Sequence, residues 1–195
     1  MRGSELRDLV LRRATVIALA TLSVLVASLL QPGVAEAATH VSSTTISSNA
    51  TWTVAGSPFI LDGSVTVAAG ATLTIEPGVV VKLNGQLRTL TVNGTMIAVG
   101  TRSAPITFTS AQDDSAGGDS NADGAATQPA PGQWYQIHFG AGSGGSQLEW
   151  LDVRYGGWGS AATAYGAISV GGVVLAMEEV SVSYSQRSGI KIGSG

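Results

Sequence analysis

The feature that most constrains this chain is a series of short stretches between Val65 and Leu83, in which apolar and polar residues alternate. Alternation at every second residue is the pattern of a β-strand with one buried side. Gly70 and the pair Pro77-Gly78 interrupt the series, and these residue types are typical of turns. The stretch therefore predicts three strands separated by turns, not a helix.

These strands follow one another too closely for most β architectures. A parallel βαβ crossover needs about a dozen residues or more, and the two-residue Asn-Gly or Asp-Gly loops of a tight hairpin are absent between them. A sandwich of hairpins stays an alternative. A solenoid fits the spacing better, because its successive strands lie on different faces and the chain stacks on itself once per roughly 20 to 30 residues.

Three phrases of the sequence carry a family resemblance. They read SPFILDGSVTVAAGATLTIEPGVVVKL, LTVNGTMIAVGTRSAPITFTS and GQWYQIHFG. They resemble the opening coils of secreted bacterial right-handed parallel β-helix proteins of the pectin-lyase-like superfold, over roughly Trp52 to Gly195. The resemblance implies an all-β fold but no single chemistry, since this fold carries lyases, hydrolases, adhesins and inert stalks.

Residues 1–37 have the organisation of a secretory signal peptide. Arginines precede an uncharged apolar run from Ala14 to Leu30, and a small-x-small cleavage motif ends at Ala37. A retained membrane anchor is the alternative, but the helix-breaking Pro32-Gly33 just before the motif favours cleavage. No second run of this length follows, so the mature chain is expected to have no membrane span and to be extracellular or displayed on the cell surface.

Composition excludes several other classes of protein. The formal net charge is −3, so the basic face expected of a nucleic-acid-binding protein is not indicated. There is no cysteine, and stability must therefore come from strand pairing and the apolar interior rather than from disulfides. Charged residues make up only 12%, about half the share in an average domain, while glycine is abundant at 26 residues, as tight coils with many corners require.

Residues 38–58 are predicted to form an N-terminal capping segment before the β-helix coils of residues 59–195. The end of a solenoid exposes apolar interior, so its terminal segment must act as a lid. Trp52 is the candidate plug by its size and by the family resemblance. The alternative is a surface aromatic residue that stacks on sugar.

An internal repeat supports the coils. Residues 151–155 align with residues 180–184 at a constant offset, and Leu148 aligns with Met177 at the same offset. Ile137/Phe139, Ile168/Val170 and Ile190/Ile192 repeat less regularly, which suggests turns of variable length. Val153, Val182, Tyr155 and Tyr184 are expected to point inward in ladders.

The strand pattern stops in an acidic loop at residues 110–133, a length that is functional or disordered in a tightly wound chain. Residues 119–124 match D-x-N-x-D-G, the opening half of a calcium loop, although Ala130 stands where an EF-hand has its bidentate glutamate. The sequence therefore gives a possible Ca²⁺ site, and a plain solvated turn is the alternative. The candidate metal ligands are Asp113, Asp114, Asp119, Asn121 and Asp123.

No catalytic constellation is visible, and no catalytic or cofactor-binding residue is assigned. The ionisable residues expected on the outer faces are Lys82, His138, Glu149, Asp152, Arg154, Glu178 and Glu179. Among them only Glu149 and Glu178 align across the repeat, which leaves one candidate carboxylate pair.

The sequence thus predicts a secreted or surface-displayed β-helix scaffold, tightened by calcium, whose faces bind a polysaccharide or another cell-surface component. The alternative is the N-terminal coils of a polysaccharide lyase or glycoside hydrolase. The two differ in the outer groove, where an enzyme needs stacked acidic and basic groups and a scaffold needs only small polar residues. Because residues 190–195 resemble an uncapped repeat, the chain is also expected to be the N-terminal part of a longer protein.

Overall fold

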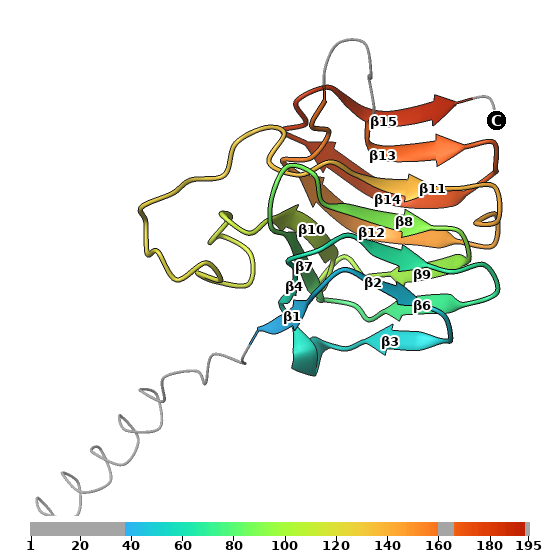
Figure 1. Ribbon diagram of the computed structural model, residues 1–195, viewed down its shortest axis with the longest axis horizontal. Coiled ribbons are helices and arrows are strands. Elements are labelled where there is room, and N and C mark those ends of the chain that lie inside the picture. The colour runs from blue at the N-terminus through green and yellow to red at the C-terminus, as the bar shows by residue number, and fades with distance from the viewer. Residues whose placement is uncertain (1–37, 160–165, 194–195) are drawn as a thin grey trace, which may run out of the picture. The chain divides into compact units, whose positions relative to one another are not determined.

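The computed structural model describes residues 38–159 and 166–193, which form a stack of parallel β coils (Figure 1). Strands close in sequence lie on different faces, and each pairs with the strand of the next coil. The predicted signal peptide, residues 1–37, lies outside the described residues. Within the described residues, no helix is long and apolar enough to cross a membrane.

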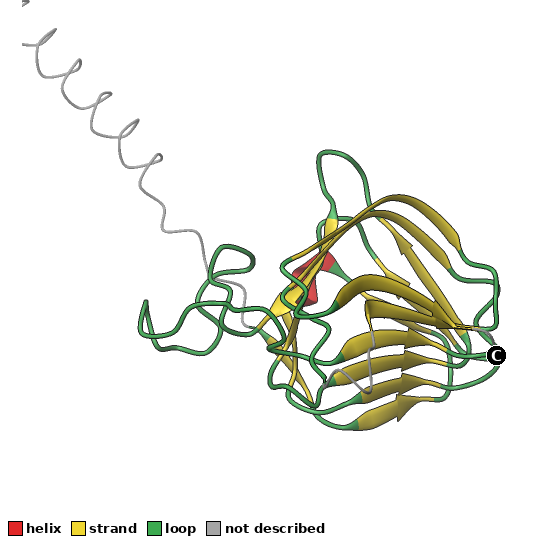
Figure 2. Cartoon of the chain, turned by 90° about the horizontal axis from the view of Figure 1, so that it is seen from above, coloured by secondary structure: helices red, strands yellow, loops and turns green. Residues whose placement is uncertain are grey.

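Each coil has three faces, seen nearly end-on in Figure 2. Face 1 is formed by β1 (Thr39–Val41), β4 (Phe59–Leu61), β7 (Val80–Leu83), β10 (Ile106–Ser110) and the second halves of β12 (Gln147–Arg154) and β14 (Ala176–Ser183). Face 2 is formed by β2 (Thr44–Ile46), β5 (Val65–Val67), β8 (Thr89–Val92), β11 (Gln136–Phe139), β13 (Gly166–Gly171) and β15 (Ser188–Gly193). Face 3 is formed by β3 (Ala50–Trp52), β6 (Thr72–Ile75), β9 (Thr95–Val99) and the first halves of β12 and β14.

The three strands expected between Val65 and Leu83 are confirmed as β5, β6 and β7, one on each face. Gly70 and Gly78, which separate them, adopt left-handed backbone angles with φ of +83° and +84°. A side chain is strained in that conformation, which explains glycine at both turns.

The interior is built from ladders of apolar side chains. On face 2, Val65 pairs in register with Leu90, Leu90 with Ile137, Ile137 with Ile168 and Ile168 with Ile190. The first four of these side chains are at most 1% exposed. Burial of each such side chain contributes about 1.5–3 kcal/mol, so the fold can be stable without cysteine.

The aligned repeat is confirmed: Leu151 pairs with Val180 and Leu148 with Met177, each on neighbouring strands β12 and β14. Both strands bend from face 3 to face 1 at one residue with a left-handed backbone, Trp150 at φ +50° and its equivalent in β14 at φ +52°. One residue therefore makes the corner that a whole turn makes in the earlier coils.

Tyr155 and Tyr184 form the expected ladder. The prediction that both side chains point inward is wrong for Tyr184, which is 62% exposed. The rings of Tyr155 and Tyr184 stack with centroids 5.1 Å apart at 11°. Both residues have positive φ, at +63° and +52°, so the alternation of side chains ends one residue before them. Trp134, fully buried, occupies the interior at this corner and lies against Gly156.

The segment expected to be a cap is itself a coil, because its strands β1, β2 and β3 pair in parallel with β4, β5 and β6. Trp52 ends β3, is 7% exposed and stacks on Phe59 with ring centroids 4.8 Å apart. A ring buried in this way is not available to stack on a sugar.

Candidate functional site

The acidic loop between β10 and β11 extends from one corner of the stack (Figure 1), but its first half packs back onto face 1. A Cβ atom placed on Gly117 would lie only 3.1 Å from the Pro58 side chain and 3.3 Å from that of Val80. Lys82, an outward residue of β7, donates a hydrogen bond from Nζ to the carbonyl of Gly118. The side chain of Lys82 is fully buried. Face 1 is therefore covered at this position.

Three of the five predicted metal ligands come together in the loop. Asp114, Asp119 and Asp123 each offer a carboxylate oxygen, and the three oxygens lie within 4.8 Å of one another. Asp119 also accepts hydrogen bonds from the backbone amides of Asp123 and Gly124, at 3.2 and 2.8 Å. Gly124 has φ +65°, so the expected sharp turn occurs at the sixth position of the motif. The turn brings the first and fifth residues of the motif together.

Asn121 lies beside the cluster and donates from Nδ2 to Asp123 Oδ2 at 2.8 Å. Thr127, which the sequence analysis did not single out, donates to the same oxygen at 2.6 Å. The other oxygen of Asp123 and Oδ1 of Asp114 are shielded from solvent, and neither has a hydrogen-bond partner among the described residues. A buried carboxylate oxygen without a donor is costly, and a cation is one means of satisfying it.

Asp113 differs from the expectation, because it faces the strands rather than the cluster. It is 1% exposed and accepts hydrogen bonds from Thr109 Oγ1 at 2.6 Å and from the amide of Ser115 at 3.1 Å. Arg154 of β12 lies 3.7 Å from Asp113 Oδ2. The side chain of Asp113 therefore fastens the start of the loop to face 1.

Charge in this region is only partly balanced. Burial lowers the pKa of Lys82, and the carboxylates of Asp113, Asp114 and Asp119 oppose that shift. The pKa of Arg154 is raised, mainly by its hydrogen bond to Asp152. Three loop carboxylates thus interact with Lys82, and Arg154 is shared between Asp113 and Asp152.

The remaining ionisable candidates are distributed over different faces. Glu149 and Glu178 pair in register on face 3 and line a cavity of about 250 Å³. Glu179 is exposed at the bend of β14, and His138 is half-buried on face 2. The structure therefore joins Lys82 and the Asp152–Arg154 pair to the loop, but not the glutamate pair or the histidine.

The sequence analysis named Lys82 only as an outer-face residue and did not name Thr109, so it missed the position of both beside the loop. Both are outward residues of face 1 and pair with each other in register. The one sequence signal for the covered position was a lysine between apolar residues of a strand. A lysine in such a strand is rarely fully buried unless other charges cover it.

Comparison with known families agrees with this fold. Residues 44–126 match the family model described as a pectate-lyase-like β-helix domain. No curated protein and no solved structure gave a match. The matched residues run from β2 into the acidic loop, and the strands after them continue the same parallel ladders. Residues 44–126 are therefore similar to a pectate-lyase-like β-helix domain, and the described residues fold as a parallel β-helix.

Proposed function

We propose that this chain is a secreted or surface-displayed β-helix scaffold whose outer faces bind glycan and whose acidic loop is stabilised by calcium. The observation that carries the scaffold role is the outward row of face 2. Thr45, Thr66 and Thr91 pair in register along three successive coils, so hydroxyl groups repeat at the spacing of the strands, about 4.8 Å. Such a row offers hydrogen bonds to sugar hydroxyls but no acid or base for cleavage.

Face 1 presents neither Lys82 nor Arg154 to a substrate. Its ionisable lysine is buried under the loop, where a substrate has no access to it. Arg154 is held by Asp152 and Asp113 and is therefore engaged in fastening the loop.

The calcium proposal rests on the geometry and charge of the loop. Asp114, Asp119 and Asp123 present oxygens at mutual distances that one cation can bridge, and two of the residues have a shielded oxygen without a donor. Ca²⁺ prefers carboxylate and carbonyl oxygen ligands in flexible loops, and waters complete its coordination.

Thermal unfolding with excess CaCl₂ and with EDTA tests this proposal. A free calcium concentration of 100 times the dissociation constant stabilises the folded state by about 2.7 kcal/mol. This raises the melting temperature by about 5–10 °C for a domain of this size. Asp119→Asn combined with Asp123→Asn should abolish the rise, whereas Glu178→Gln, an exposed carboxylate on face 3, should preserve it. Equal melting temperatures in calcium and EDTA would contradict the calcium role.

Glycan binding is tested by retention of the chain on immobilised polysaccharides, acidic and neutral. We expect retention without release of sugar fragments. Replacement of Thr66 and Thr91 by valine keeps the shape of both side chains and removes their hydroxyl groups, so it should weaken retention. Unchanged retention by this double variant would exclude face 2 as the binding face.

A second candidate function is glycoside hydrolysis, which the Glu149–Glu178 pair favours. Their backbones occupy neighbouring strands, about 4.8 Å apart, and the pair lines a cavity. Retaining glycosidases place their two carboxyl groups about 5–5.5 Å apart. Release of reducing ends from a polysaccharide, lost in Glu149→Gln, would establish hydrolysis and displace the scaffold proposal.

A further inference from the structure

The chain contains two Asn-Gly pairs, Asn84-Gly85 and Asn93-Gly94, each in a turn that follows a strand of the coils. Asparagine is one of the thermolabile residue types. The backbone nitrogen of the next residue can attack the side-chain amide of asparagine, and glycine favours this attack because it has no side chain to obstruct the approach. The two pairs are equivalent in sequence, but the structure distinguishes them.

The pair Asn93-Gly94 is protected from this reaction. The amide of Gly94 donates a hydrogen bond to the carbonyl of Val67 at 3.2 Å, and the amide of Asn93 donates to the same carbonyl at 2.9 Å. Gly94 is buried, and a Cβ atom placed on it would lie 2.2 Å from the carbonyl oxygen of Ala68 and 2.3 Å from that of Ala71. The nitrogen of Gly94 is therefore engaged, and its backbone cannot move without displacing the preceding coil.

The pair Asn84-Gly85 is open. Both residues are exposed, and the amide of Gly85 has no hydrogen-bond acceptor among the residues that the structure describes. Gly85 has φ +117°. For a Cβ atom placed on Gly85, the nearest atom beyond its chain neighbours is Nε of Arg88, at 4.0 Å. The nitrogen that would attack Asn84 is therefore free and unobstructed.

Arg88 acts on this nitrogen through the peptide bond. Its Nε atom donates a hydrogen bond to the carbonyl oxygen of Asn84 at 3.2 Å. This oxygen and the Gly85 nitrogen belong to the same peptide group. The guanidinium group therefore withdraws electrons from that group and stabilises the anion that forms when the nitrogen loses its proton. The deprotonated nitrogen is the nucleophile of the reaction.

Asp62 lies beside the leaving group. Asn84 Nδ2 donates a hydrogen bond to Asp62 Oδ1 at 2.8 Å, and His40 Nδ1 lies 2.7 Å from the other carboxylate oxygen. The hydrogen bond from Asn84 lowers the pKa of Asp62, so this group is a carboxylate at neutral pH. A carboxylate in this place stabilises the positive charge that Nδ2 acquires as it leaves.

From these contacts we propose that Asn84 is a self-modification site, which deamidates within the folded chain far faster than Asn93. The Gly85 nitrogen forms a bond to Cγ of Asn84, the bond between Cγ and Nδ2 breaks, and ammonia leaves with the proton of the Gly85 amide. Water then opens the resulting succinimide ring at one of its two carbonyl groups. The product is aspartate or isoaspartate at position 84.

This product changes one corner of the stack. A carboxylate replaces the amide that donated to Asp62, so two negative groups face each other where a hydrogen bond joined two coils. Isoaspartate also lengthens the main chain by one atom between β7 and β8. We therefore expect a lower melting temperature after conversion. The reaction goes beyond the proposed scaffold role and requires neither glycan nor calcium.

The test is incubation of the folded full chain at neutral pH, followed by tryptic digestion and mass spectrometry. Trypsin cleaves after Lys82, Arg88 and Arg102, so the two asparagines fall in separate peptides, residues 83–88 and 89–102. We expect conversion of Asn84, with isoaspartate among the products, while Asn93 stays largely intact. In urea the contacts are lost, and both residues should convert at similar rates. Equal rates in the folded chain, or no conversion of Asn84, would overturn the proposal.

Single substitutions test the two assisting groups. Arg88→Gln removes the guanidinium group and should slow the conversion of Asn84 several-fold in the folded chain but not in urea. Asp62→Ser removes the carboxylate without creating a new Asn-Gly pair, and it should also slow the conversion. Arg102→Gln removes a cation from an exposed turn elsewhere and should leave the rate unchanged. An undiminished rate in both Arg88→Gln and Asp62→Ser would refute the assistance that these contacts imply.

Discussion

Lys82→Met is the change that most directly tests how the acidic loop is held. Lys82 is fully buried and hydrogen-bonded to Gly118, and the carboxylates of Asp113, Asp114 and Asp119 oppose the lowering of its pKa. Methionine has a similar length and no charge, so the substitution removes the ammonium group without a large cavity. Two effects then compete. Burial of methionine costs less free energy than burial of an ammonium group, but the carboxylates of the loop lose a neighbouring positive charge.

The second effect should dominate. Loss of a hydrogen bond from a charged donor costs about 1.5–3 kcal/mol, and removal of one partner from a buried ionic group costs about 3–5 kcal/mol. A loss of about 3 kcal/mol lowers the melting temperature by about 6–12 °C in a domain of 150 to 250 residues. These measured ranges already include the desolvation cost that methionine avoids. Lys82→Met should therefore destabilise the folded state overall.

Calcium should reverse part of this loss. With Lys82 absent the loop carries one more uncompensated negative charge, and a cation bound by Asp114, Asp119 and Asp123 then meets less competition. Thermal unfolding in EDTA and in CaCl₂ should therefore show a larger calcium effect for the variant than for the unaltered chain. The control is Arg102→Met, which removes a cation from an exposed turn and should alter stability by no more than about 0.5 kcal/mol.

Two results would refute the reasoning. An unchanged melting temperature of Lys82→Met in EDTA would mean that the buried ammonium group does not fasten the loop. A calcium effect no larger than in the unaltered chain would mean that Lys82 and calcium do not share the same carboxylates.

Three further predictions concern the coils. Leu90→Ala removes a fully buried side chain from the face 2 ladder and should cost about 2–5 kcal/mol in urea unfolding. Gly156→Ala places a methyl group 2.6 Å from the Trp134 ring and should cost about 1–3 kcal/mol, detected by urea unfolding together with a change in tryptophan fluorescence. Asp62 has its pKa lowered from 3.8, chiefly by the hydrogen bond from Asn84, so its stabilising contribution is present above about pH 4 and is lost as pH falls through the lowered value. The stability difference between the unaltered chain and Asp62→Asn should therefore shrink below that pH in a urea series.

The coils could be predicted from sequence because each strand repeats a local pattern. Inward apolar residues at every second position, interrupted by Gly70 and Gly78, specify both the strands and their breaks. The pairing of residues 151–154 with 180–183 followed from two repeats of equal length. Local alternation and constant length are properties that one sequence displays directly.

The one-residue corners also have a sequence signal, which is a shift in the phase of the alternation. Leu148 points inward, and the next inward residues are Leu151 and Val153, so the alternation shifts phase by one position at Trp150. The same shift occurs in β14. A change of phase without a turn residue indicates a bend within a strand, and here it replaces a loop.

The arrangement around the acidic loop could not be predicted, because it depends on which part of the coil the loop covers. The sequence motif predicted that Asp119 and Asp123 converge, since the turn that joins them is local. It did not predict that Asp113 faces Thr109 and Arg154, or that Lys82 lies beneath the loop. Apart from the local contact between Asp113 and Thr109, these contacts join residues far apart in the chain, and no periodicity relates them.

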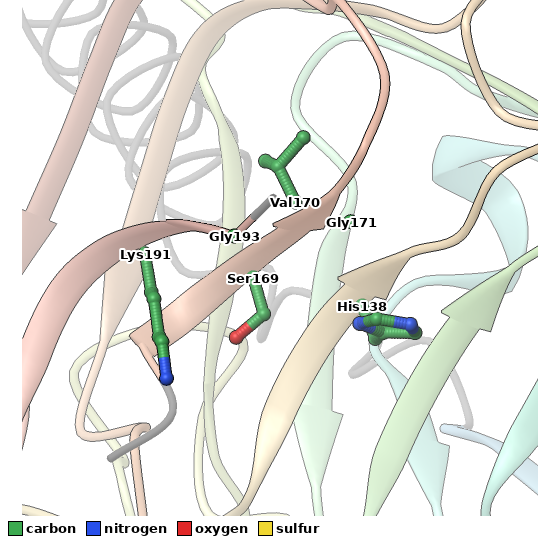
Figure 3. Close-up of a pocket in the computed structure, with 6 residues that line it drawn as sticks. All are labelled: His138, Ser169, Val170, Gly171, Lys191 and Gly193. Carbon is green, nitrogen blue, oxygen red and sulfur yellow. The ribbon is translucent and has the colours of Figure 1, made fainter. Parts of the chain in front are cut away.

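Register explains how the chemistry of an outward row on face 2 can change from one coil to the next (Figure 3). A parallel coil places equivalent residues in straight rows, so a substitution in one coil changes the chemistry of a row at one point without disturbing the strands. On face 2 the row of Thr45, Thr66 and Thr91 becomes basic at His138 and Lys191. Because the backbone of each coil is fixed by its inward residues, the outward positions are free to carry the ligand specificity. Exchange of outward residues between the coils of one row should therefore move a binding site along the stack while the unfolding free energy stays nearly constant, and chemical denaturation of such variants would measure that separation.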